Sequence, residues 1–85
     1  MKNFNEIVQV NSFYFPGGSV ARSMPRTIEC GFDRHTFIDG LQYLVKKGSQ
    51  LVKFFDMSDG RNTYRLRLES DEWTLVSIKP ARAMV

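Results

Sequence analysis

The sequence contains little cysteine and histidine and no long hydrophobic run. One cysteine in 85 residues cannot form an internal disulfide. Small domains in oxidising compartments usually depend on such bridges, so we expect a cytoplasmic location for this chain. Its longest apolar stretches are triplets such as Phe13-Tyr14-Phe15, whereas a membrane span needs roughly 18 consecutive residues. We therefore expect no targeting segment and no membrane partner.

The groups that perform chemistry are equally scarce. A zinc site with four nitrogen or sulfur ligands cannot be built from one histidine and one cysteine. Cys30 alternates with Ile28 and Phe32 and is expected in the core, while His35 is expected in a solvated or capping role. The acidic residues have local explanations as caps, turn residues or solvent-face residues, and no phosphate-binding glycine pattern is present. The sequence therefore predicts a protein that is not an enzyme, with no catalytic residue, metal or cofactor.

A single folding unit is expected, because the chain shows no internal repeat, low-complexity tract or shift in composition. We assign residues 1–85 to one domain and residues 81–85 to a loose tail. An irregular loop is expected after Phe15, through Pro25. Strands are predicted from their apolar and β-branched residues at 6–15, 27–32, 50–56, 63–69 and 73–79.

Alternation along these strands assigns side chains to faces. In the first strand Val8, Val10 and Tyr14 share one face, and Ile7, Phe13 and Phe15 share the other. Tyr64, Leu66 and Leu68 are expected to face the core, with Arg65, Arg67 and Glu69 in water. In the last strand Trp73 and Leu75 are expected on one side, with Val76 and Ile78 on the other.

A helix is predicted over 33–47. Asp33 can cap it, Lys46 and Lys47 suit its last turn, and Gly48 supplies a left-handed end. Its apolar residues fall within about 120° of the helical wheel: Phe37, Ile38, Leu41, Leu44 and Val45. Gly40 lowers helix stability by up to ~1 kcal/mol against alanine, and would allow another backbone to approach closely.

The predicted fold is therefore α+β, in the order ββαβββ. An antiparallel sheet of about five strands would carry one amphipathic helix on one face. Asp59-Gly60 is a strong hairpin signal between two of the strands.

Charge and aromatic content give the functional expectation. Twelve Lys and Arg against nine Asp and Glu leave a net charge of +3, which permits an anionic partner without requiring one. Seven phenylalanines, three tyrosines and one tryptophan exceed what such a small core needs, so some are expected on the surface. We expect a protein-binding module, an inhibitor or regulator that acts by steric docking, with a homodimer as a further possibility. Small proteins of this size without catalytic groups include phage and plasmid antagonists, immunity proteins and antitoxins.

Binding of single-stranded nucleic acid is the alternative prediction. An odd-length loop at Asp59-Gly60 would place Lys53 and Phe55 beside Arg65 and Arg67, as in basic-aromatic single-strand binders. An even loop would place Val52 and Phe54 there instead. The residues predicted to contact a partner are Arg22, Arg26, Lys53, Phe55, Arg61, Arg65 and Arg67.

Overall fold

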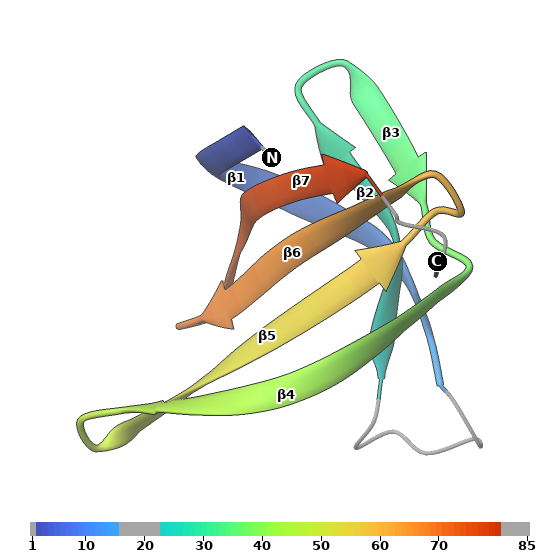
Figure 1. The fold of residues 1–85 in the computed structure, drawn as a ribbon. Coiled ribbons are helices and arrows are strands. Elements are labelled where there is room, and N and C mark those ends of the chain that lie inside the picture. The colour runs from blue at the N-terminus through green and yellow to red at the C-terminus, as the bar shows by residue number, and fades with distance from the viewer. Residues whose placement is uncertain (1, 16–22, 81–85) are drawn as a thin grey trace.

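The described part of the chain, residues 2–15 and 23–80 of a computed structural model, consists entirely of strands and their connections (Figure 1). The strands are β1 (Lys2–Tyr14), β2 (Met24–Cys30), β3 (Asp33–Thr36), β4 (Asp39–Lys47), β5 (Gln50–Ser58), β6 (Asn62–Glu69) and β7 (Glu72–Pro80). The α+β prediction is wrong, because these residues form an all-β fold. No helix that could cross a membrane occurs in this part of the chain.

All seven strands belong to one antiparallel sheet, in the order β3-β2-β1-β7-β6-β5-β4. The strands at its two ends, β3 and β4, are separated in sequence only by Phe37 and Ile38. The sheet must therefore curl until its edges meet, as Figure 1 shows at the link between β3 and β4. At this joint the Phe37 N–H donates to the Arg26 carbonyl on β2 at 2.7 Å, and the Ile38 N–H donates to the Ser58 carbonyl on β5 at 2.8 Å.

The core fills the inside of the curled sheet. Its largest fully buried side chains include Phe37, Phe55, Ile28, Met57, Leu66 and Leu75. The predicted inward residues of β6 are confirmed, since Tyr64 and Leu66 are buried and Leu68 packs against the core. In β1, Val8, Val10 and Tyr14 face the core, and Ile7, Phe13 and Phe15 are exposed. The face assignment of the first strand is therefore confirmed.

The predicted helix over 33–47 is wrong. Residues 33–36 pair with β2, and residues 39–47 pair with β5 along their whole length. The apolar stripe of that helix is not buried as a unit. Phe37 is fully buried, whereas Ile38, Leu41 and Leu44 are 70%, 60% and 55% exposed. In an extended conformation, this segment forms backbone hydrogen bonds with β2 and with β5. If it were a helix, β2 and β5 would each be an edge strand with unpaired backbone groups.

The glycines that were interpreted as features of a helix, Gly40 and Gly48, have roles in the β4–β5 hairpin instead. Gly48 has φ 62° and, with Ser49, forms the two-residue loop between β4 and β5. A helix end and a tight hairpin both require this positive φ, so glycine alone does not distinguish them. The close approach expected at Gly40 is confirmed, because a Cβ there would lie 2.9 Å from the Asp56 carbonyl oxygen and would overlap Met57.

Two other predictions for side chains are corrected. Phe32 was expected in the core, but it lies in the two-residue loop between β2 and β3 and is fully exposed. Ile78 was expected opposite Trp73 and Leu75, but all three pack against the core. An irregularity in the pairing of β6 with β7, between Leu75 and Ser77, inserts one extra residue and returns Ile78 to the core side.

Candidate functional site

The predicted arginine pair lies on the outer face of the sheet. Arg65 is opposite Asp56, and Arg67 is opposite Phe54. The Arg65 guanidinium donates to both carboxylate oxygens of Asp56, at 3.0 and 3.2 Å, and this bond raises the pKa of Arg65 above its usual value. The Arg67 Nε atom lies 3.8 Å from Glu69. Both cations therefore have a carboxylate beside them, which reduces the positive potential of this face.

Lys53 and Phe55 are not on that face. Ser58 pairs with Thr63, so the β5–β6 loop has four residues and the even register holds. Phe54 is therefore the aromatic beside the arginines. Phe55 is 2% exposed and packs against Trp73 with ring centroids 5.0 Å apart. Of the two loop lengths considered for nucleic-acid binding, the structure has the even one, and the odd-loop arrangement of Lys53 and Phe55 beside the arginines is absent from it.

The remaining predicted contact residues are separated. The Arg26 guanidinium lies 4.7 Å from the centroid of the Tyr14 ring, on the β1–β2 side of the molecule. Arg61 is exposed in the β5–β6 loop, where its N–H donates to Asp59 Oδ1 at 2.8 Å. Arg22 lies outside the described residues. Of the described members of the predicted set, the structure thus brings only Arg65 and Arg67 onto a common face.

A different surface, missed in the sequence, is formed by the β4–β5 arm, which we define as residues 41–54. Figure 1 shows this hairpin reaching beyond the other strands. Its exposed apolar residues are Leu41, Leu44, Val45 and Leu51. Lys46 and Lys47 are exposed next to them. The run Tyr43-Leu44-Val45 followed by Gly48-Ser49 is a hairpin signal, but Leu41, Leu44 and Val45 also fit the buried stripe of the predicted helix.

Among the described residues no strand pairs with the outer edge of β4, which therefore offers free backbone groups. Lys47 and Gln50 flank a two-residue turn, and such a flanking pair is joined by hydrogen bonds. In an antiparallel ladder the bonded pairs alternate, so Lys47, Val45, Tyr43 and Leu41 direct their backbone groups to β5. Gly40, Gln42, Leu44 and Lys46 direct theirs away from it. In agreement, the Gly40 N–H is bonded to the Asp39 side chain, at 2.8 Å.

A groove of about 330 Å³ runs beside the first half of this edge. Tyr14 and Met24 form one wall, and the other comprises Ile38, Asp39, Gly40, Leu41 and Gln42. β2 and β4 meet at the joint near Phe37 and leave this space where they separate. The edge is therefore accessible there as well as along the arm.

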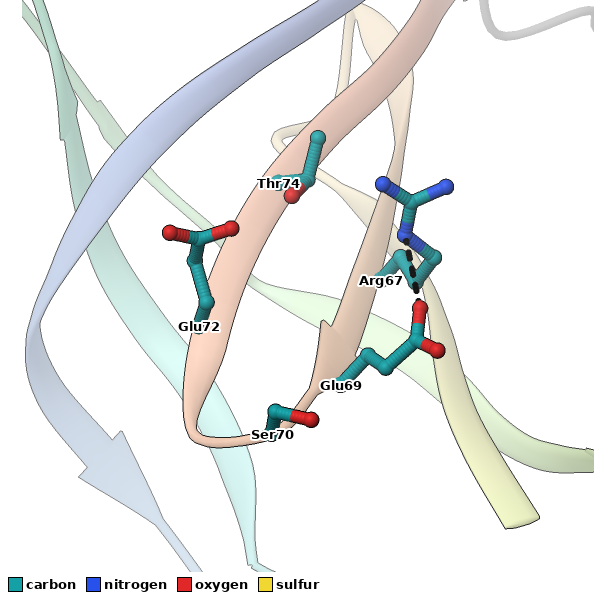
Figure 2. A pocket seen from close by; sticks show the side chains of 5 residues that line it. All are labelled: Arg67, Glu69, Ser70, Glu72 and Thr74. Carbon is teal, nitrogen blue, oxygen red and sulfur yellow. Dashed lines mark ion pairs between the residues drawn. The ribbon is translucent and has the colours of Figure 1, made fainter. Parts of the chain in front are cut away.

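A second hollow, of about 260 Å³, lies at the β6–β7 turn (Figure 2). Arg67, Glu69, Ser70, Glu72 and Thr74 line it, and Figure 2 shows Glu69 turned toward Arg67 across the hollow. The two carboxylates come from adjacent strands, Glu69 being opposite Glu72. The lining combines two carboxylates, two hydroxyl groups and one guanidinium.

One cluster of titratable groups is structural. The Tyr64 hydroxyl donates to Asp59 Oδ2 at 2.8 Å and lies 3.1 Å from His35 Nδ1. Since that hydroxyl has only one proton, Nδ1 must be the donor toward Tyr64. Partial burial raises the pKa of Asp59, but N–H groups of Asn62 and Arg61 and the Tyr64 hydroxyl outweigh it and hold that pKa below its usual value. Through the Tyr64 hydroxyl, the cluster links His35 on β3 to Asp59 in the β5–β6 loop.

Cys30 is not an activated thiol. Burial and a hydrogen bond to Glu6, at 3.1 Å, raise its pKa to about 11. A nucleophilic cysteine has a lowered pKa and a nearby cation. Among residues 2–15 and 23–80, no three His, Cys, Asp or Glu side chains are grouped so that they could hold a metal ion.

Comparison with known proteins gives no relative: no family model, no curated protein and no solved structure matches this chain.

Proposed function

We propose that this chain is a non-enzymatic protein-binding module whose binding surface is the β4–β5 arm. One observation carries the proposal: exposed apolar side chains concentrate on a strand whose outer edge has unpaired backbone groups. Apolar side chains contribute area to an interface, and a free edge contributes main-chain hydrogen bonds to an added strand. By occupying a surface of its partner, the module would act as a steric inhibitor or regulator in the cytoplasm.

The alternative, binding of nucleic acid, has less support. Single-strand binders combine stacking aromatics with unneutralised cations. Here Tyr43 and Phe54 stack on each other with centroids 5.6 Å apart. Arg65, Arg67 and Lys47 each lie within 4 Å of a carboxylate.

Selection from a displayed library of random peptides tests the proposal. We expect clones that bind the wild-type protein and lose binding to the arm variant Leu44→Ser/Leu51→Ser. The matched control, Ile7→Ser/Phe32→Ser, removes two exposed apolar side chains outside the arm and should bind the clones normally. Circular dichroism should show that both variants keep the wild-type spectrum. Equal binding of the clones to the arm variant, or failure to select any clone, would contradict the proposal.

A further inference from the structure

The charges of β4 would be complementary in an antiparallel pair of two copies of this strand. It reads Asp39-Gly40-Leu41-Gln42-Tyr43-Leu44-Val45-Lys46-Lys47, with an acid at one end and two lysines at the other. An antiparallel pair of such strands places opposite charges across from each other. A parallel pair would place lysines beside lysines, which is unfavourable.

We propose that, when no partner protein is bound, the β4 edge is covered by a second copy of this chain, paired antiparallel through β4 with Tyr43 on the two-fold axis. The inference rests on the proposed role of the arm as a binding surface, and names its occupant. The same edge of both copies would form the contact, as closed two-fold dimers require. The two curled sheets would then be continuous across the interface.

Hydrogen-bond geometry selects this register. Only Gly40, Gln42, Leu44 and Lys46 direct backbone groups outward, so these residues must pair among themselves. Centring on Tyr43 pairs Gly40 with Lys46 and Gln42 with Leu44, which uses all of them. A shift of the centre to Gln42 or Leu44 leaves one of the end residues, Lys46 or Gly40, without a partner.

Side chains favour the same register. On the outer face it places Asp39 opposite Lys47 and Leu41 opposite Val45, and it brings the two Tyr43 rings together. Leu41 is 60% and Val45 41% exposed in the single chain, so contact between them covers apolar surface. With the centre on Leu44, Lys47 would instead lie opposite Leu41.

The residues that the structure describes leave a groove of about 330 Å³ beside the first half of β4. The groove bounded by Tyr14 and Met24 would receive the end of the other copy's strand, including Lys46 and Lys47. The Asp39 carboxylate now accepts the Gly40 N–H. In the dimer it would gain the Lys47 ammonium of the other copy, which in the single chain lies 3.6 Å from Glu69 Oε2. The Gly40 N–H would bond the carbonyl of Lys46.

Charge reversal with mixing tests the partner and the register together. Asp39→Lys places lysine opposite Lys47 twice in a homodimer, and Lys47→Glu places glutamate opposite Asp39 twice. By sedimentation we expect the wild type to dimerise and each variant to dimerise about tenfold more weakly, from changes of about 1 kcal/mol or less at each pair. An equal mixture of the two variants restores both opposite-charge pairs and should associate like the wild type.

A cysteine on the axis checks the register independently. In the Cys30→Ser background, Tyr43→Cys places two thiols at a non-hydrogen-bonded pair, where Cα atoms are about 4.5 Å apart and a disulfide can form. Mild oxidation should yield a covalent dimer. Leu41→Cys in the same background should yield none alone, but should cross-link when mixed with Val45→Cys.

Several outcomes would overturn the inference. These are a wild type that remains monomeric up to about 1 mM, variants that do not regain association when mixed, or cross-linking of Leu41→Cys with itself. A monomeric wild type whose arm still binds displayed peptides would remove the dimer and leave the proposed function standing. Loss of both would remove the arm as a binding surface.

Discussion

Gly40→Ala gives a test in which the sign of the effect depends on the fold. In an exposed helix interior, alanine would stabilise the protein by about 1 kcal/mol relative to glycine. In the closed sheet, the added Cβ lies 2.9 Å from the Asp56 carbonyl oxygen and overlaps the end of Met57. Overpacking of this kind costs about 1–3 kcal/mol, so we expect a clear loss of stability.

The measurement is thermal and urea unfolding followed by circular dichroism. For a domain of this size, 1 kcal/mol corresponds to about 4–8 °C in Tm, so a loss of about 2 kcal/mol lowers Tm by about 8–16 °C. Met57→Val removes the side-chain end that the Cβ would overlap. Gly40→Ala should therefore cost less in that background than in the wild type, with coupling of about 1 kcal/mol.

A positional control separates this effect from loss of glycine as such. Gly31 has φ 63° with no atom within 4 Å of an added Cβ. Gly31→Ala should therefore cost only the left-handed strain, about 1–2 kcal/mol, and Met57→Val should not change that cost. Stabilisation by Gly40→Ala, or equal costs in the two Met57 backgrounds, would refute the close packing of β4 against β5.

Three further predictions concern other parts of the fold. Burial and Glu6 raise the pKa of Cys30 to about 11. Its thiolate is therefore scarcer at pH 8 but more nucleophilic, and its iodoacetamide reaction should be about tenfold slower than that of a free thiol. Glu6→Gln should accelerate the reaction, and an unchanged rate would contradict the role of Glu6. The lowered pKa of Asp59 stabilises the fold at pH values above the unfolded-state pKa, about 4. This contribution should be lost as pH falls through the folded-state pKa, and Asp59→Asn should flatten the acid side of a urea-midpoint profile; an equally steep profile would contradict it. Ser70 and Asp71 both have positive φ in a two-residue loop, so Ser70→Asn/Asp71→Gly should raise stability by about 0.5–1 kcal/mol in urea unfolding, and a decrease would argue against this turn.

The sequence determined most of the strands and their faces. Alternation in 63–69 and 6–15 is a local property, and burying one face of each strand admits few registers. Asp59-Gly60 likewise predicted the β5–β6 hairpin from local sequence. The reason is that the Asp59 carboxylate accepts hydrogen bonds from the N–H groups of Arg61 and Asn62 within the loop itself. The sequence also shows directly that histidine and cysteine are scarce, and this scarcity led to the expectation of a protein that is not an enzyme.

Only the tertiary structure decided the conformation of 33–47. Its apolar spacing and its end signals at Asp33 and Gly48 suit a helix, and nothing local reveals that β2 and β5 each need a neighbour. A bent strand supplies both with hydrogen bonds and closes the sheet, so long-range pairing outweighs local periodicity. Because this segment is a strand at the edge of the sheet, Leu41, Leu44 and Val45 are exposed, although they were expected in the core. The candidate site could therefore not be predicted from the sequence, because its side chains are exposed only as a result of β4 being the edge strand of the sheet.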